Sequence, residues 1–333
     1  MAARIGSSTD EKANQGVPDV SIVIVNWNAK EFLEGCLHSV FNSNGRLSLE
    51  VLVVDNASKD GSAAMVNGRF PGVRVISNGI NRGFAKANNQ GIRASTGRYI
   101  LLLNPDTVLM PGALERLVEY LEANPAAGAV GPRMHGPRGE TLESFSHFPG
   151  PRLLARGVAI VLTGKYYRDE HLKSLEPRQV DWVGGACLMV RREALEQVGL
   201  LDEKFFMYWE EADLCLRLRR QNWKTYYVPE SQVIHYLGRS AAKAEDHVLI
   251  HGILLQAWGK SAAWFLKKHY PLWVRFLFRV VVLGFAAISL LFWSIVWLLP
   301  SNRRKAREII RAYALALGLI RHEEEVELPT PKD

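Results

Sequence analysis

The chain has 333 residues, of which 48% are hydrophobic and 23% charged, and this composition suits one large globular domain or a domain with an appendage. The formal net charge of +7 allows an anionic partner such as a nucleotide or an anionic membrane, and we expect no nucleic-acid partner. The three cysteines form no CxxC pair, which argues against a disulfide framework and favours a reducing compartment. Residues 1–18 are polar, so we expect a disordered segment, not a signal peptide.

From Val20 onward, apolar strand-like runs alternate with segments of helical spacing. The runs are residues 21–27, 51–55, 73–76 and 99–103, and the helical segments are residues 31–41, 84–93 and 112–123. This alternation predicts a parallel sheet with right-handed crossovers, in which ligands bind at the carboxyl ends of the strands. The polar residues at those ends are Asn26, Asn28, Asp55, Asn56, Asn78, Asn81, Asn104 and Asp106. We therefore expect a binding site along this edge.

Several common signatures are absent from the sequence. Residues 259–261 read GKS, like the end of a P-loop, but Leu254 stands where the upstream glycine is required. No GxGxxG follows the first strand, and there is no HExxH. These absences argue against a P-loop NTPase and against an NAD enzyme.

Two strand-end segments have a chemical and a structural interpretation. Asp55 and Asn56 offer oxygens that can accept an N–H of a pyrimidine base, but both are also ordinary turn residues. In Asn104-Pro105-Asp106 the carboxylate can hold a divalent cation, or the proline simply ends the strand.

An acidic cluster and a histidine lie further along. Glu210, Glu211 and Asp213 open an amphipathic helix within residues 205–220. Acidic residues in a first helical turn are explained by the helix dipole, yet one of them can also be a general base whose pKa a neighbouring carboxylate raises. His235 follows an apparent strand and is either structural or a metal ligand.

Taken together, these segments resemble the inverting glycosyltransferase family 2, most closely its rhamnosyltransferase-like branch. The resemblance spans roughly residues 20–240 and consists of eight ordered blocks: SIVIVNWN, VVDNASKDGS, NRGFAKANNQGI, YILLLNPDT, GAVGPR, DWVGGACLMVRREA, DEKFFMYWEEADLCLRLRR and VIHYLG. It implies an α/β chain of the GT-A fold, with a mixed, mostly parallel central sheet flanked by helices.

The resemblance also implies roles for individual residues on the donor side. The nucleotide-sugar contacts that it implies are Asn26, Asp55, Asn56, Asn81, Gly83, Phe84 and Asn104. The family's DxD motif corresponds to residues 104–106, where asparagine replaces the first aspartate, so Asp106 is the expected ligand of Mg²⁺ or Mn²⁺. His235 is the expected additional metal ligand.

On the acceptor side, the family's Glu-Asp pair corresponds to Glu210-Glu211, which implies Glu211 as catalytic base, with Asp213 as a possible substitute. Trp182, Gly184 and Gly185 are expected to line the sugar and acceptor side. A single displacement at the anomeric carbon then inverts its configuration.

The expected reaction is transfer of a sugar from a nucleoside diphosphate to a hydroxyl of a glycan or lipid-linked glycan, in cell-surface polysaccharide biosynthesis. L-rhamnose from dTDP-rhamnose is the donor that the resemblance favours. A pyrophosphorylase would need a glycine-rich basic loop after the first strand, which NWNAKEFLEGC does not provide. A catalytically degenerate sugar-nucleotide-binding or scaffold protein is the second alternative, because Asn104 and Glu211 depart from the family pattern.

The C-terminal part has a different composition. Residues 280–299 contain no charge, and a helix of twenty residues at about 1.5 Å each would span a hydrocarbon core of roughly 30 Å. A buried or oligomer-forming helix is the alternative, and residues 306–320 suit an interfacial helix. We expect a disordered segment at 1–18, a transferase domain at 19–240 and a membrane-associating helical region at 241–333. We expect the chain to lie at the cytoplasmic face of the inner membrane.

Overall fold

The computed structural model describes residues 16–43, 45–149, 174–236 and 247–299, together with residues 303, 306, 307 and 309–311. The disordered segment expected at 1–18 falls mostly outside these residues, as does most of the interfacial helix expected at 306–320.

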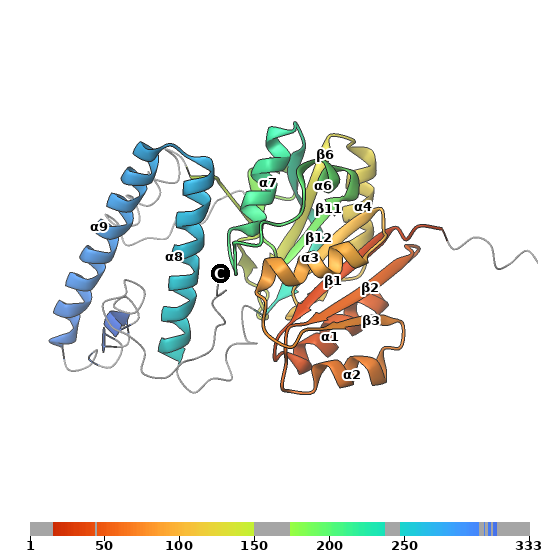
Figure 1. Cartoon of the computed structure of the whole chain (residues 1–333), viewed down its shortest axis with the longest axis horizontal. Helices are drawn as coiled ribbons and strands as arrows, with labels where there is room; N and C mark the ends of the chain where they lie inside the picture. Colours follow the sequence, from red (N-terminus) through yellow and green to blue (C-terminus); the bar gives the residue numbers. More distant parts are fainter. Residues whose placement is uncertain are drawn as a thin grey trace, which may run out of the picture.

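A ten-stranded sheet forms the centre of the structure (Figure 1). Its strands are β1 (Val20–Asn26), β2 (Leu49–Asp55), β3 (Val73–Ser77), β4 (Tyr99–Leu103), β5 (Thr107–Leu109), β6 (Ala127–His135), β7 (Thr141–Leu142), β9 (Arg178–Val180), β11 (Cys187–Arg191) and β12 (Lys224–His235). Their order is β3-β2-β1-β4-β11-β6-β12-β5, with β7 beside β6 and β9 beside β12. A small second sheet pairs β8 (Phe145–Ser146) with β10 (Trp182–Val183).

The two halves of the large sheet differ in strand direction. Strands β3, β2, β1 and β4 are parallel, as predicted, so their carboxyl ends share one edge. Strand β11 runs antiparallel between β4 and β6, and β5 runs antiparallel to β12, which makes the sheet mixed. The register places Asn26 opposite Asp55 and His235 opposite Thr107.

Helices cover both faces of the sheet. They are α1 (Lys30–Asn42), α2 (Ser62–Arg69), α3 (Phe84–Ala94), α4 (Ala113–Ala123), α6 (Arg192–Val198) and α7 (Glu210–Arg220). The helices predicted near α1, α3, α4 and α7 are present. The sequence does not predict α2. This helix follows a turn-like segment that ends at Gly61, and its eight residues carry little apolar periodicity.

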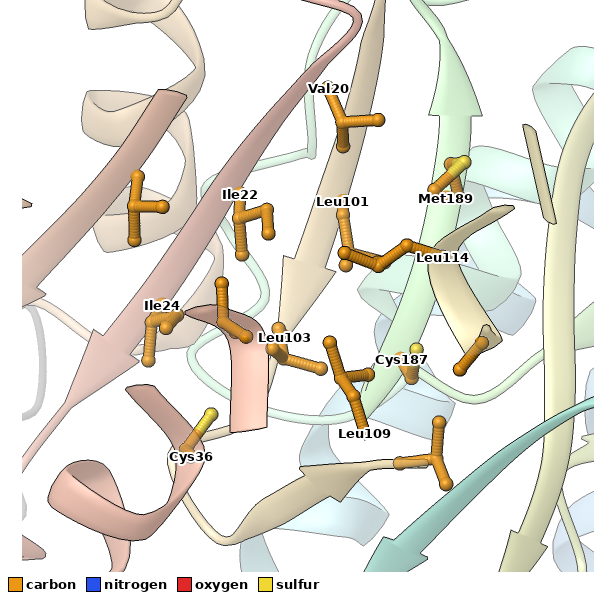
Figure 2. Close-up of a cluster of buried hydrophobic side chains, with 14 of the residues drawn as sticks. Val20, Ile22, Ile24, Cys36, Leu101, Leu103, Leu109, Leu114, Cys187 and Met189 are labelled. Carbon is orange, nitrogen blue, oxygen red and sulfur yellow. The ribbon is translucent and has the colours of Figure 1, made fainter. Parts of the chain in front are cut away.

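Alternate residues of β1 enter two separate hydrophobic cores. Ile22 and Ile24 belong to a core that also contains side chains of α1 and α4 (Figure 2), whereas Val23 packs with side chains of α3 and α7 on the other face. The cause is that successive side chains of a strand point to opposite faces. The apolar runs therefore bury both faces of the sheet and leave the polar strand ends at its edge.

The three cysteines are free thiols buried in these cores. Cys36 and Cys187 lie in the first core and Cys215 in the second. Burial raises the pKa of Cys36 and Cys215 to about 12. The thiols are therefore protonated at neutral pH.

Two long helices, α8 (His247–His269) and α9 (Leu272–Trp297), follow the sheet domain and run side by side in opposite directions (Figure 1). Within the described residues, α9 is the one helix long and apolar enough to cross a membrane, with a mean hydropathy of 2.4 and only 6% of its most apolar window buried. It begins at Leu272, earlier than the segment expected at 280–299.

The core predicts a large difference between two leucine substitutions. Leu101 is fully buried in β4, so Leu101→Ala should lower the free energy of unfolding by about 2–5 kcal/mol through lost burial and a residual cavity. Leu175 is 71% exposed, and Leu175→Ala should change that energy by less than about 0.5 kcal/mol. Urea unfolding followed by circular dichroism measures both values. Equal losses in the two variants would contradict this placement of the core.

Candidate active site

The ends of β1 and β2 form the first part of the site. Asn26 donates from Nδ2 to Asp55 Oδ1 at 3.2 Å and to Ser58 Oγ at 3.1 Å. The backbone N–H of Ser58 donates to Asp55 Oδ2 at 3.1 Å. Asn26 Oδ1 is buried without a hydrogen-bond partner in the described part of the chain. An unpaired buried acceptor is costly, so Asn26 is a candidate for contact with a bound ligand.

Asn56 organises the loop that follows β3. Its Nδ2 donates to Asn81 Oδ1 at 2.8 Å, and its Oδ1 accepts from Asn78 Nδ2 at 3.2 Å and from the Arg82 N–H at 3.0 Å. Asn81 Oδ1 also accepts the N–H of Gly83 at 2.9 Å. The Asn56 amide thus holds residues 78–83 in place beside the strand ends.

Gly83 ends this loop in a conformation that a side chain would disturb. Its φ is +81°, and a Cβ at this position would lie 2.7 Å from the carbonyl oxygen of Phe206. That same carbonyl accepts the N–H of Phe84, the first residue of α3, at 2.7 Å. Close backbone contact therefore joins the loop after β3 to the segment that precedes α7.

The turn after β4 forms the second part. Oδ1 of Asp106 lies 3.3 Å from Nε2 of His235, and the two side chains are 3% and 13% exposed. The antiparallel pairing of β12 with β5 brings the histidine there. One carboxylate and one imidazole are chemically suited to hold a Mg²⁺ or Mn²⁺ ion together with ligands from outside the chain. Within the described residues, no group of three potential metal ligands occurs.

Two adjacent carboxyl groups at the start of α7 form the third part. Burial, and then the charge of Glu211, raise the pKa of Glu210 well above its usual value. Burial also raises the pKa of Glu211, but hydrogen bonds from Glu210 and from the backbone of Gly185 favour its charged form. One oxygen of each carboxyl, Oε2, is buried without a partner among the described residues. Both pKa values are therefore raised, that of Glu210 more strongly, and Glu211 is the member of the pair whose charged form is favoured by hydrogen bonds.

The backbone just before this pair is strained. Tyr208 and Trp209 have φ values of 69° and 72°, although neither is glycine. Such conformations cost on the order of 1–3 kcal/mol each and persist only where the surroundings enforce them. The ring of Trp209 lies 6.4 Å from that of Trp182, and both indole nitrogens are buried without a partner in the described structure.

Asp213 lies on the same helix but in different surroundings. Its side chain is fully buried and contacts Arg217 at 2.8 Å, Lys268 at 2.7 Å and His269 at 2.7 Å. Burial alone would raise its pKa, but the hydrogen bond from His269 and the charges of Arg217 and Lys268 outweigh burial and lower the pKa to about 2. Asp213 is therefore an ionised partner of Arg217, Lys268 and His269.

Residues 184–186 connect the second and third parts. Ala186 O accepts the N–H of Asn104 at 2.9 Å. A Cβ on Gly185 would lie 3.5 Å from the Phe84 ring and 3.9 Å from Glu211 Cβ. The sequence-predicted residues of β1, β2, β4, α3, α7 and this loop are thus linked into one region, and Asp213 faces away from it toward α8.

Several residues that organise this region are not indicated by the sequence. Ser58 is not among the predicted site residues, yet its hydroxyl accepts from Asn26 and from the N–H of Asn28. Ser261 belongs to the GKS segment and donates to Met207 O at 2.8 Å, while Lys268 and His269 contact Asp213. No local pattern indicates such long-range contacts.

The sheet, with its polar strand ends and flanking helices, has the GT-A fold of nucleotide-sugar transferases. A solved mannosyltransferase from Pyrobaculum calidifontis, in complex with GDP-Man and Mn²⁺, matches it with a TM-score of 0.52 and 16% identity, covering 92% of this chain and 87% of that one.

Residues 21–199 match Glycosyl transferase family 2, and the chain belongs to this family of enzymes. It is 32% identical to the N-acetylglucosaminyl-diphospho-decaprenol L-rhamnosyltransferase of Mycobacterium tuberculosis over 289 residues, 80% of this chain and 90% of the relative. It is 27% identical to the Escherichia coli rhamnosyltransferase WbbL over 65% of this chain and 83% of that protein. The resemblance read from the sequence is confirmed, and the chain is a glycosyltransferase.

The contact at Gly83 predicts that Gly83→Ala lowers stability by at least about 1–2 kcal/mol, because an alanine is strained at this φ and its Cβ meets a carbonyl oxygen. We also expect weaker nucleotide binding, because the loop that ends at Gly83 must shift. Gly79→Ala is the matched control, since a Cβ there has nothing within 4 Å. Thermal unfolding and nucleotide titration calorimetry measure both effects, and indistinguishable variants would contradict the prediction.

Proposed function

We propose that the enzyme transfers L-rhamnose from dTDP-L-rhamnose to a hydroxyl of a lipid-linked glycan, with inversion at the anomeric carbon, in cell-surface polysaccharide biosynthesis. The name of the mycobacterial relative, which aligns over 90% of its length, supports both the sugar and a polyprenyl-diphosphate acceptor. The name of the Escherichia coli relative supports the same sugar.

The observation that carries the catalytic part of this proposal is the pair of unequal carboxyl groups at the start of α7. Glu211 is the base, because hydrogen bonds from Gly185 and Glu210 favour its ionised form while burial raises its pKa toward the working range. Glu210 stays protonated and orients it. Asp213 is not the base, since its carboxylate is held by three partners and its pKa is about 2.

Donor binding is proposed for the strand-end edge. Asn26, Asp55 and Asn56 lie where the pyrimidine base would bind, and the loop from Asn81 to Phe84 would follow the ribose and diphosphate. Asp106 and His235 would hold a divalent cation, which when bound neutralises charge on the diphosphate. Asn104 would line the diphosphate side. The acceptor side would be lined by Trp182, Gly184 and Gly185.

The reaction balances as one displacement. Glu211 takes the proton of the acceptor hydroxyl, and the hydroxyl oxygen forms a bond to the anomeric carbon. The bond from that carbon to the diphosphate oxygen breaks on the opposite face, and the nucleoside diphosphate leaves with the electron pair. No covalent intermediate with the enzyme is required.

Glu211→Gln should lower kcat about 10²–10⁴-fold, because the glutamine amide cannot accept the hydroxyl proton. Donor affinity should be retained. In the unmodified enzyme, kcat should fall as the pH drops through the pKa of Glu211, which burial raises above 4.5. Transfer of rhamnose from dTDP-rhamnose to a polyprenyl-diphosphate N-acetylglucosamine in detergent, with Mn²⁺, measures both effects.

Glu196→Gln is the matched control, because Glu196 is exposed on α6 and should tolerate the change. Turnover by Glu211→Gln equal to that of the unmodified enzyme would exclude Glu211 as base. Donor binding without transfer to any acceptor by the unmodified protein would instead favour a degenerate sugar-nucleotide-binding protein.

We propose further that α9 inserts into the membrane that carries the acceptor, with the transferase domain on the cytoplasmic face. The exposed apolar side chains of α9 include Leu272, Trp273, Phe276, Leu283, Ile288, Leu291, Phe292 and Ile295. This uncovered surface is long and continuous, which is typical of a helix in contact with lipid.

Two arginines in α9 should abolish that insertion. Leu283 and Leu291 are 57% and 64% exposed, and a charged side chain in the middle of a bilayer costs roughly 2.5–3.5 kcal/mol. Leu283→Arg with Leu291→Arg should stay at the bottom of a liposome flotation gradient, whereas the unmodified chain should float. Leu175→Arg, outside α9, should float as well. Failure of the folded unmodified chain to float would contradict insertion.

A further inference from the structure

Helix α8 contacts the strained turn that precedes the two glutamates. Ser261 Oγ donates to the carbonyl oxygen of Met207 at 2.8 Å, just before the two residues of positive φ. Phe265 is fully buried, and its ring centroid lies 4.9 Å from that of Trp209. Helix α8 therefore contacts the backbone before the turn, at Met207, and packs against the side chain of its second residue, Trp209.

Lys268 ties together the two ends of the segment that contains this turn. Its Nζ lies 2.8 Å from Asp202 Oδ2 and 2.7 Å from Asp213 Oδ1. Trp264 Nε1 adds a hydrogen bond to Asp202 Oδ2 at 3.3 Å. Because Asp202 precedes the turn and Asp213 follows it in the first turns of α7, a single ammonium group fixes the distance across the turn.

His269 makes a second contact of defined direction with the same carboxylate. Its Nδ1 lies 3.0 Å from a guanidinium nitrogen of Arg220, and its Nε2 lies 2.7 Å from Asp213 Oδ1. A guanidinium only donates, so Nδ1 accepts and Nε2 carries the hydrogen that is donated to Asp213. The imidazole thereby fixes both the start and the end of α7 against α8, and its side chain is only 1% exposed.

The chain distance from this contact to the proposed base is short. Asp213 is two residues beyond Glu211, and its N–H donates to the carbonyl oxygen of Trp209 at 2.8 Å. A rotation of α7 that followed loss of the Lys268 and His269 contacts would therefore move Glu211 relative to Gly185. The residues proposed to bind the donor on β1 and β2 lie on other elements and would stay in place, whereas Phe84, whose N–H donates to Phe206 O, lies beside the turn.

We propose that Lys268 and His269 of α8 are positioning residues, which act through Asp213 to hold the strained turn and to align Glu211 with the acceptor hydroxyl. This role rests on the proposed function of Glu211. The family match covers residues 21–199, and α8 lies beyond it. The proposal therefore gives a helix outside the matched part a role in positioning the base. Because α9 begins directly after α8, it also joins the candidate membrane helix to the catalytic helix.

The test compares Lys268→Met and His269→Phe with their conservative counterparts Lys268→Arg and His269→Gln. In the first two variants kcat at saturating donor and acceptor should fall about 10–100-fold, since a misplacement of about 1 Å has effects of that size. The dissociation constant for dTDP, measured by calorimetry, should change less than about twofold, because the contacts that hold Asn26, Asp55 and Asn56 involve neither α7 nor α8. Lys268→Arg and His269→Gln retain a donor toward Asp213 and should recover most of kcat.

Lys260→Met is the control, since it removes the same charge from an exposed position of α8 and should leave kcat unchanged. Hydrogen exchange of the amides from Tyr208 to Asp213 gives a readout independent of turnover, and should quicken in Lys268→Met and His269→Phe only. If these two variants do not fold, Ser261→Ala takes their place in the test, because it removes a single hydrogen bond to Met207. The loss of kcat and the faster amide exchange should then be smaller.

Unchanged kcat and unchanged exchange in folded variants would overturn the proposal. A parallel loss of kcat and dTDP affinity that the conservative variants do not recover would also overturn it, because that pattern indicates general destabilisation. Failure of the proposed function has a different signature: Glu211→Gln would remain active, or the unmodified enzyme would not turn over, whatever the result for amide exchange.

Discussion

Burial of two adjacent carboxyl groups at the start of α7 is the constraint on which the rest of the site depends. Removing a carboxylate from water costs several kcal/mol unless hydrogen bonds and favourable dipoles compensate for it. For Glu210 this cost raises the pKa well above its usual value, whereas Glu211 receives hydrogen bonds from Gly185 and Glu210 at the positive end of the helix. Any element that supplies one of these compensating groups is therefore fixed relative to α7.

That requirement explains why residues 184–186 connect so many parts. The loop lies between β10 and β11, and β11 is the antiparallel strand inserted beside β4. Insertion of β11 at this position brings Gly185 to Glu211 and Ala186 to Asn104. A purely parallel sheet would not place a strand start here. The mixed direction of the sheet thus brings the candidate base next to the candidate diphosphate side.

The sequence predicts the parallel half of the fold well, for a local reason. Short apolar runs that end in Asn26, Asp55 and Asn104 must be buried strands with polar ends, and parallel strands put those ends on one edge. The ordered motif blocks predict the family, which the comparisons confirm. The roles of individual site residues stay predictions, because they depend on a bound donor and acceptor.

Other features depend on contacts between distant residues and have no local signal. His269 contacts Asp213 although 56 residues separate them, and the sequence around either residue does not predict the contact. The sequence leaves Asp213 as a possible substitute for Glu211, whereas the fold separates Asp213, an ion-pair partner with a lowered pKa, from two glutamates whose pKa values are raised by burial. The positive φ of Trp209 is equally hidden, since tryptophan rarely adopts it and only tertiary packing enforces it.

The distribution of the three thiols makes each layer of the domain chemically distinguishable. Cys36 and Cys187 lie beneath the α1 and α4 side of the sheet, and Cys215 lies beneath the α7 side. A buried, protonated thiol reacts with an alkylating reagent only when its surroundings open. The order in which these cysteines become alkylated during mild destabilisation therefore reports which side of the sheet separates first, without any introduced label.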